Sequence, residues 1–291
     1  MKTAWVLRGG ASFGAVQVGQ ARALLEAGHH PDLLYGASAG ALNAAWLAAD
    51  PTLEGLSTLA KLWTAMRARA VFPFNPVTVV AGLAGLLDHT VSSRSFARWL
   101  RQASPLRRLE EGALPLGVMA TDIQTGEEVL LESGPAVPAL LASCAVPGIF
   151  PPVNIGGRWL MDGGISNDTP VGRAVQAGAD RVWVLPCVPE GKLAKPRSAL
   201  GALLASSSIA LGRQSAREVA TWAGSCEVFV VPAPTVPGAS PFRFDHTAEL
   251  IEAAYELVSR WLPTAMAYGR APAAGQPELT CGPSTSSNDS G

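Results

Sequence analysis

Charged residues, cysteines and long hydrophobic runs are all scarce in this 291-residue chain. Only 15% of the residues are charged and 48% are hydrophobic, which excludes a disordered chain and a coiled coil. The net charge of −1 lacks the basic excess of nucleic-acid-binding proteins, so we expect no nucleic-acid partner. No stretch reaches the ~18 consecutive apolar residues that a membrane-spanning helix needs.

The few cysteines are widely spaced and form no C-x-x-C pair; they are Cys144, Cys187, Cys226 and Cys281. This spacing indicates neither a disulfide framework nor a zinc site, and no His/Cys/carboxylate cluster has the spacing of metal ligands. We therefore expect no metal, no organic cofactor and a reduced, cytoplasmic setting.

Strands and helices punctuated by glycine are predicted along the first 50 residues. The apolar run at 3–7 is too short for a secretory signal and predicts a first strand. Helical spacing follows at 14–27, a buried strand at 31–35 ended by Gly36, and a helix at 39–49 that stops before Pro51. This order predicts a three-layer α/β/α fold with a mostly parallel central sheet.

Further elements extend the same scheme to residue 269. Two hairpins are predicted, one pairing 116–121 with 127–132 and the other pairing 153–155 with 158–161. Short strands are predicted at 181–185 and 227–231, and long helices at 198–222 and 247–261. No break in composition divides the chain, so we expect one domain over residues 1–269. Residues 270–291 are rich in Pro, Ser, Gly and Thr and predict a disordered tail.

A candidate nucleophile stands between the second strand and the second helix, in Gly36-Ala37-Ser38-Ala39-Gly40. A G-x-S-x-G pentapeptide in this setting is typical of a nucleophile elbow, where the serine sits on a sharp turn. The following helix directs the positive end of its dipole at the place where an oxyanion would form. The alternative is an ordinary turn in which Ser38 is the helix N-cap.

A serine hydroxyl needs a base, and two candidates stand out. Asp162 follows an apolar strand and precedes Gly163 and Gly164, so its carboxylate can occupy a confined site with a raised pKa. Of the four histidines, only His246 follows an acid in the Ser–Asp–His order of α/β-hydrolases. The alternatives are a loop cap for Asp162 and a helix N-terminal role for His246.

The loop at 8–14, R-G-G-A-S-F-G, enters the first helix and can bind an anion through its backbone N–H groups. It is not a P-loop, because Ala15 and Val16 replace the Lys-Ser/Thr pair. It is not a dinucleotide fingerprint, which needs glycine at Ala11. We expect it to serve Ser38 as an oxyanion hole.

Together these motifs resemble the patatin-like phospholipase family over about residues 3–190. Residues 142–152 (A-S-C-A-V-P-G-I-F-P-P) resemble its A-S-x-A-x-P-x-x-F-P-P segment. Residues 162–170 (D-G-G-I-S-N-D-T-P) resemble its D-G-G-x-x-N-x-P segment, with one residue more between the asparagine and the proline. The resemblance implies a patatin-like fold, a Ser38–Asp162 dyad without histidine and hydrolysis of lipid acyl esters through an acyl-enzyme. It implies an oxyanion hole at Gly9, Gly10 and Ala11.

Two positions of the loop depart from the family's G-G-G-x-R/K-G pattern: Ala11 stands at the third glycine and Phe13 at the basic position. If the third position needs a positive φ, alanine costs about 1 kcal/mol there. Neither change removes a backbone N–H, so we expect catalysis to persist.

Residues 61–108 form a basic and apolar insertion that predicts a cap. They hold eight basic residues and one acid, and Arg94, Arg98 and Arg101 share one predicted helix face. An apolar stripe of Val79, Val80, Leu83, Leu86 and Leu87 lies beside them. Such a segment predicts peripheral contact with an anionic membrane. The alternative is that these leucines belong to the core and the arginines to a solvated face.

The leading interpretation is a serine acyl hydrolase that cleaves (phospho)lipid esters. Two alternatives stay open: an esterase for small soluble esters with a Ser38–Asp–His246 triad, and a non-catalytic lipid-binding protein. The sequence does not identify the natural lipid, the ester position, a competing acyl transfer or the oligomeric state.

Overall fold

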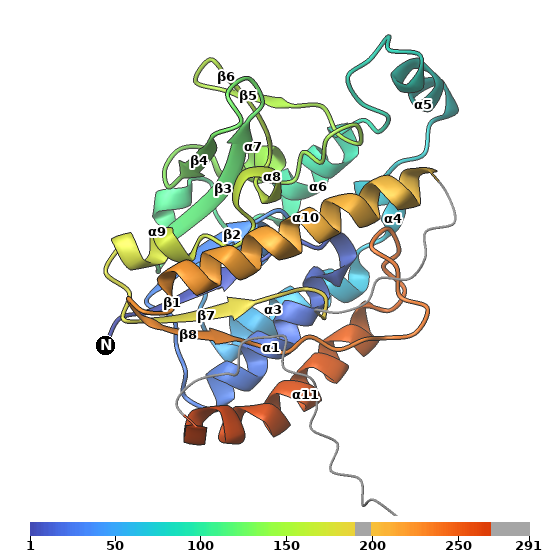
Figure 1. The fold of residues 1–291 in the computed structure, drawn as a ribbon. Helices are drawn as coiled ribbons and strands as arrows, with labels where there is room; N and C mark the ends of the chain where they lie inside the picture. Colours follow the sequence, from blue (N-terminus) through green and yellow to red (C-terminus); the bar gives the residue numbers. More distant parts are fainter. Residues whose placement is uncertain (190–198, 269–291) are drawn as a thin grey trace, which may run out of the picture.

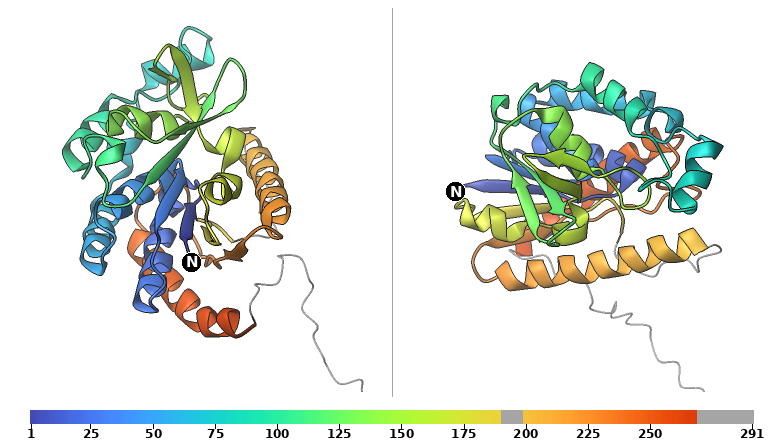
Figure 2. Two further views of the ribbon diagram at one scale, coloured as in Figure 1. Left: turned by 90° about the vertical axis from the view of Figure 1, so that its left-hand side faces the viewer. Right: turned by 90° about the horizontal axis from the view of Figure 1, so that it is seen from above.

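The computed structural model describes residues 1–189 and 199–268. The tail predicted at 270–291 and the first residue of the helix predicted at 198–222 lie outside the described residues. Within the described part, a mixed sheet is covered by helices on both faces (Figures 1 and 2). None of its helices is both long and apolar enough to cross a membrane.

The sheet has the strand order β5-β6-β3-β2-β1-β7-β8, with β4 paired to β3. The pairs of β1 with β2 and β7, of β2 with β3 and of β7 with β8 are parallel, whereas those involving β4, β5 and β6 are antiparallel. The strands are β1 (Thr3–Leu7), β2 (Leu33–Ala37), β3 (Leu116–Asp122), β4 (Glu128–Leu131), β5 (Val153–Ile155), β6 (Arg158–Asp162), β7 (Arg181–Leu185) and β8 (Glu227–Val230).

The helices divide between the two faces of the sheet. One face is covered by α1 (Ala15–Glu26), α2 (Ala39–Ala49), α3 (Leu53–Ala65) and α11 (Thr247–Tyr268), and the other by α9 (Val171–Gln176) and α10 (Ala199–Trp222) (Figures 1 and 2). Shorter elements are η1 (Ala11–Gly14), α4 (Ala68–Val71), α5 (Pro76–Leu83), α6 (Arg94–Ala103), η2 (Leu109–Glu111), α7 (Ala136–Ser143) and α8 (Gly164–Asn167). The predicted α/β/α fold with a mostly parallel sheet is confirmed.

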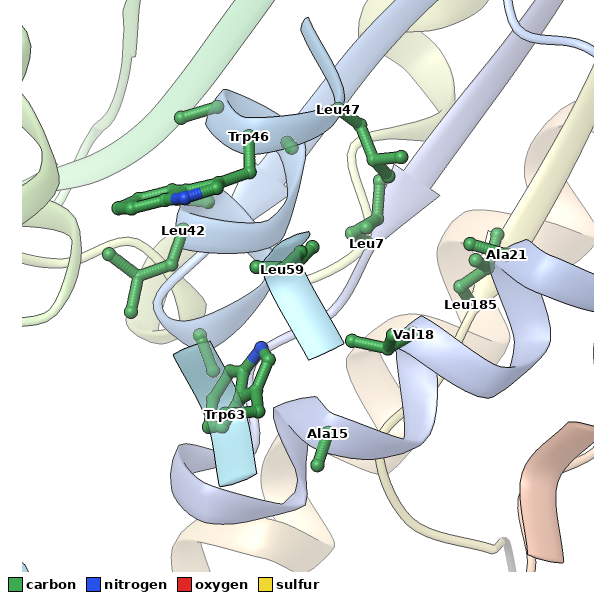
Figure 3. Close-up of a cluster of buried hydrophobic side chains, with 14 of the residues drawn as sticks. Leu7, Ala15, Val18, Ala21, Leu42, Trp46, Leu47, Leu59, Trp63 and Leu185 are labelled. Carbon is green, nitrogen blue, oxygen red and sulfur yellow. The ribbon is translucent and has the colours of Figure 1, made fainter. Parts of the chain in front are cut away.

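The central strand β1 is buried on both faces, which explains why it reads as a continuous apolar run. Trp5 and Leu7 point into the larger core beneath α1, α2 and α3, whereas Ala4 and Val6 point into the core beneath α9 and α10. Figure 3 shows part of the larger core, where Leu7 and Leu185 of the sheet meet the side chains of the first three helices.

Two elements differ from their predicted bounds by two residues or more. The second strand runs over 33–37 rather than ending at Gly36, because Gly36 still pairs with Leu7 and Val118 in the ladders on either side. The last helix continues to Tyr268 and contains Pro263, although it was predicted to end at 261. Its apolar face stays buried past the proline, at Ala265, which explains the extension.

The insertion at 61–108 is built from the end of α3 and from α4, α5 and α6. In α6, Phe96, Ala97 and Leu100 are buried, and the arginines 94, 98 and 101 are exposed. In α5 no residue is buried, and this helix projects from the body of the molecule (Figure 1). The alternative that the apolar stripe belongs to the core is therefore wrong for Val80, Leu83, Leu86 and Leu87.

Candidate active site

Ser38 occupies a sharp turn between β2 and α2. Its backbone angles are φ 54° and ψ −125°, in the region that L-residues other than glycine rarely adopt. A Cβ on Gly36 would lie 2.4 Å from the oxygen of Gly40, and a Cβ on Gly40 would lie 2.0 Å from the oxygen of Leu7. Both glycines of the pentapeptide are thus required by close backbone contacts, and the strained turn presents the Ser38 side chain.

The end of α7 connects the Ser38 turn to the Asp162 turn. The backbone N–H of Ser38 donates to Ser143 Oγ at 2.9 Å, and the Ser143 carbonyl accepts from the N–H of Gly163 at 3.3 Å. The N–H of Asp162 donates to the carbonyl of Ala145 at 3.0 Å. Residues 143–145 therefore hold the two candidate residues in one frame.

Asp162 is the last residue of β6, where it pairs with Ala120 of β3, and its side chain is buried. Its Oδ1 accepts from the N–H of Gly164 at 2.9 Å. Its Oδ2 is buried and has no well-formed hydrogen bond from the described part of the chain. Gly163 is required here, because a Cβ would lie 2.2 Å from the oxygen of Met119. One oxygen of the carboxylate is thus left open to accept a proton.

Burial raises the pKa of Asp162 to about 7, because a desolvated carboxylate resists ionisation. The nearby hydroxyl of Ser38 and the N–H of Gly164 lower this pKa, and the negative charge of Asp168 raises it. The interaction with Ser38 places the hydroxyl and the carboxylate side by side. A carboxyl group with a pKa near neutrality can both accept and return a proton.

The thiol of Cys144 lies beside the same two residues. Burial and the charge of Asp162 raise its pKa well above the ordinary value, and the Ser38 hydroxyl counteracts this shift. A thiol held in its neutral form is a weak nucleophile, so Cys144 packs as a small apolar side chain.

The glycine loop follows β1 and approaches Ser38 closely. A Cβ on Gly9 would lie 3.1 Å from Ser38 Cβ, and a Cβ on Gly10 would lie 2.3 Å from Cys187 Cβ. Ala11 adopts φ 51°, so the third position of the loop does require a positive φ and alanine is strained there by about 1 kcal/mol. The N–H of Gly9 donates to Asp168 Oδ1 at 2.7 Å and is engaged in this structure.

Buried amide side chains hold the glycine loop in place through hydrogen bonds. Gln17 Nε2 donates to the carbonyls of Arg8 and Leu185, both at 2.8 Å. Asn43 Nδ2 donates to the carbonyl of Gly14 and to Gln17 Oε1, and Asn43 Oδ1 accepts from Trp63 Nε1 at 2.7 Å. This chain of bonds ties the loop to α1, α2 and α3.

The histidine of the alternative triad has other partners. His246 Nδ1 lies 3.0 Å from Glu249 Oε2, and Gly238 packs against the other edge of the ring. His89 bonds to Asp88, and His29 packs against Trp183. No hydrogen bond between a histidine and Ser38 occurs in the described ranges. The titratable groups that interact with the Ser38 hydroxyl are instead Asp162 and Cys144.

Sequence reasoning assigned no role to Ser143, Asp168, Gln17 or Arg8. Each leaves a signal in the sequence. Ser143 is a hydroxyl among small residues, and Asp168 is an acid just past the Asp-Gly-Gly turn. Gln17 is an amide on an apolar helix face, and Arg8 is a cation directly after a buried strand. None of these signals identifies its partner, because the partners lie far away along the chain.

Known proteins resemble this chain in sequence and in fold. The family model of the patatin-like phospholipases matches residues 5–175. An uncharacterised NTE family protein of Mycobacterium tuberculosis is 32% identical over 101 residues, which cover 33% of this chain and 28% of that protein. The patatin-like phospholipase domain-containing protein 7 of Rattus norvegicus is 30% identical over 178 residues, 60% of this chain and 13% of that protein. The chain thus matches less than a third of the length of either relative.

Solved structures with a similar arrangement include human GIVD cytosolic phospholipase A2 in complex with methyl gamma-linolenyl fluorophosphonate. Its TM-score is 0.46 at 11% identity, over 92% of this chain and 58% of that chain. VipD from Legionella pneumophila has a TM-score of 0.46 at 15% identity, over 90% of this chain and 67% of that chain.

Proposed function

The chain belongs to the patatin-like phospholipase family, and from that premise we propose that it is a serine hydrolase of lipid acyl esters. Ser38 is the nucleophile and Asp162 the general base of this proposal. The observation that carries it is the buried Asp162 carboxylate, with a pKa of about 7, beside the hydroxyl of a serine on a strained turn.

The reaction runs in two halves. Ser38 Oγ attacks the ester carbonyl carbon while Asp162 takes the hydroxyl proton, and the carbonyl oxygen becomes an oxyanion. The tetrahedral intermediate expels the alcohol, which receives the proton from Asp162, and an acyl-Ser38 ester remains. Asp162 then deprotonates a water that attacks this ester, and the fatty acid leaves as Ser38 regains its proton.

The oxyanion is stabilised by backbone N–H groups of the glycine loop. The residues implied by the family are Gly9, Gly10 and Ala11. Because the N–H of Gly9 donates to Asp168, we assign the donors to Gly10 and Ala11 and a supporting role to Gly9. The positive end of α2 adds to this stabilisation.

Peripheral contact with an anionic membrane belongs to the same proposal. The arrowheads of β7 and β8 point toward the side on which α4 and α5 lie (Figure 1), and β1 and β2 run parallel to β7. The glycine loop follows β1 and Ser38 follows β2, so both lie at the edge of the sheet that faces that side. α5 lies on that side, and the exposed apolar side chains of Phe74, Val77 and Leu83 on it or just before it would meet lipid.

Labelling with a fluorophosphonate probe, located by mass spectrometry, tests the dyad. Wild type is compared with Ser38→Ala, Asp162→Asn and His246→Ala. We expect label on Ser38 that is lost in Ser38→Ala, strongly reduced in Asp162→Asn and retained in His246→Ala.

The other outcomes identify the alternatives. Loss of label in His246→Ala, with Asp162→Asn unaffected, would favour the triad esterase. A folded wild type that takes no label but retains lipid would favour the non-catalytic lipid-binding protein.

A further inference from the structure

A buried ion pair joins the start of the glycine loop to the segment that follows Asp162. Arg8 Nε donates to Asp168 Oδ2 at 2.8 Å, and both side chains are at least nine-tenths buried. The second oxygen of the same carboxylate accepts from the N–H of Gly9 at 2.7 Å. Asp168 therefore binds two successive residues of the loop.

The backbone N–H and carbonyl of Arg8 are also held by hydrogen bonds. Its N–H donates to the carbonyl of Leu185 at 3.1 Å, and its carbonyl accepts from Gln17 Nε2 at 2.8 Å and from Cys187 Sγ at 3.2 Å. With Arg8 held in this way, the direction of the next peptide depends on the acceptor that meets the Gly9 N–H. That acceptor is Asp168.

Gly9 is enclosed between the two halves of the site. A Cβ at this position would lie 3.1 Å from Asp168 Oδ1 and 3.1 Å from Ser38 Cβ. A displacement of the Asp168 carboxylate would therefore move the Gly9 peptide relative to Ser38. The amides of Gly10 and Ala11 follow immediately and would move with it.

We propose that Asp168, held by Arg8, is a positioning residue that sets the glycine loop against Ser38. It acts through the loop and does not touch the substrate. This inference rests on the proposed function, because it assumes that the loop amides face a reacting carbonyl oxygen.

The energetics favour a positioning role over a purely stabilising one. Removing two charges from water is costly, and an apolar pair of similar volume is often as stable. An apolar pair, however, would leave the Gly9 N–H without its acceptor and would lack the directionality of hydrogen bonds. Precise placement matters, since a misplacement of about 1 Å can reduce a rate about 100-fold.

Asp168 also acts on Asp162 through its charge. The side chains that face these two carboxylates are Arg8 from the loop, Ser38 after β2, and the neutral thiols of Cys144 and Cys187. A Cβ on Gly164 would lie 3.1 Å from Asp162 Oδ1 and 3.4 Å from Asp168 Oδ1, so the two carboxylates flank one residue. Removal of the Asp168 charge should lower the pKa of Asp162.

The first variant is Asp168→Asn, assayed on a p-nitrophenyl ester of a short fatty acid. We expect kcat to fall about 10- to 100-fold with KM changed less than about threefold, since the loss affects the transition state. The acid limb of the pH–rate profile should move to lower pH. That shift reports the lost charge of Asp168, whereas a merely structural role would lower the amount of folded enzyme without lowering kcat per folded molecule.

The second variant, Arg8→Lys, keeps the positive charge and removes the guanidinium N–H that binds Asp168. It should lower kcat while leaving the acid limb in place. This variant also keeps the proposal testable if Asp168→Asn fails to fold.

Asp122→Asn is the matched control. Asp122 is an equally buried carboxylate that accepts from an arginine Nε, that of Arg158, at 2.8 Å, but it also accepts from the N–H of Gln124 and not from the glycine loop. We expect this variant to have the kcat of the wild type and the same acid limb in its pH–rate profile.

Two results would overturn the proposal. One is an unchanged kcat in both Asp168→Asn and Arg8→Lys, and the other is a fall in kcat of the same size in Asp122→Asn. Failure of the proposed function itself is recognised separately, because Ser38→Ala would then retain esterase activity and probe labelling.

Discussion

Two buried carboxylates, Asp162 and Asp168, both lie close to the Cβ position of Gly164 but in different electrostatic surroundings. Asp168 has the guanidinium of Arg8 as its counterion, whereas Asp162 faces a hydroxyl and a backbone N–H. Neighbouring acids whose pKa values are shifted by different surroundings are typical of acid–base sites. In the proposed mechanism, the carboxylate without a cation moves the proton and the paired one orients the loop.

The rate of ester hydrolysis should depend on pH through Asp162. A general base must be ionised to act, and the pKa of Asp162 is raised to about 7 by burial. We expect kcat/KM to rise about tenfold per pH unit below this value and to level off above it. Measurement of kcat/KM from pH 5 to 9 tests this, with His246→Ala as the control that keeps the same limb. A limb that disappears in His246→Ala would contradict the assignment.

At the scale of elements, α5 and α6 present two different kinds of surface. α6 buries Phe96 and Leu100 and exposes its arginines, as an amphipathic helix on the body of the protein does. α5 has no buried residue at all, and Leu83 and Leu86 near its end are 79% and 78% exposed. Exposed apolar side chains beside a basic face suit an anionic lipid surface better than water.

Charge reversal on α6 tests this membrane contact. The triple variant Arg94→Glu, Arg98→Glu and Arg101→Glu should bind vesicles of anionic phospholipid about 100-fold more weakly, since each cation near such a surface contributes about 1 kcal/mol. A sedimentation assay measures the partitioning.

The control carries the same change in net charge on other helices. It replaces the exposed arginines 213, 217 and 260 of α10 and α11 by glutamate. Equal losses in the two triple variants would mean that only the net charge matters, and no loss in the first would remove the membrane contact from the proposal.

At the scale of the whole molecule, the parallel strands β1 and β2 bring the glycine loop and the Ser38 turn to one edge of the sheet, where α7 and β6 add Asp162. This assembly buries carboxylates that the unfolded chain exposes to water. A carboxyl group whose pKa is raised on folding binds more protons in the folded state, so stability falls as pH rises between its two pKa values.

The free energy of unfolding should therefore carry a penalty from Asp162 at high pH. Its pKa rises from 3.8 to about 7, so the penalty is absent below pH 3.8, grows across this window and is complete above about pH 7. We expect Asp162→Asn to be more stable than the wild type at pH 8, by an amount of the order of a few kcal/mol, and to lose this advantage at pH 4. Thermal unfolding at the two pH values measures it.

Asp122→Asn should behave in the opposite way. The hydrogen bond from Arg158 lowers the pKa of Asp122, so its ionised form stabilises the fold above the ordinary pKa of 3.8 and that contribution is lost as pH falls. This variant should therefore be less stable than the wild type at pH 8. A difference between Asp162→Asn and wild type that did not change with pH would contradict the assigned burial of the Asp162 charge.

Much of the fold was predictable because it depends on local patterns. The buried strands read as apolar runs, the helices show their spacing, and 39–49 was predicted with the observed bounds. Gly36 and Gly40 could be identified because a nucleophile elbow needs close backbone approach, and the contacts of 2.4 and 2.0 Å show that need here. Such requirements act within a few residues, so they leave a mark on the sequence.

The ends of helices and strands, and the exposure of apolar segments, were harder to predict from the sequence. The last helix was predicted to end at 261, yet α11 packs against α1 and continues past Pro263 to Tyr268. The apolar stripe at 79–87 fitted both a buried and an exposed segment, because periodicity alone does not say whether a partner covers it.

The sequence by itself therefore determined the α/β/α order of elements, the elbow around Ser38 and the Asp-Gly-Gly turn of Asp162, because steric and periodic constraints are local. Only the tertiary structure decided that Arg8 pairs with Asp168, that Ser143 connects the two turns and that His246 bonds to Glu249. The first two contacts join residues that are distant along the chain, whereas His246 and Glu249 are three residues apart. Which charged or polar side chains meet in a buried site depends on how the whole sheet and its helices pack, and no local pattern contains that information.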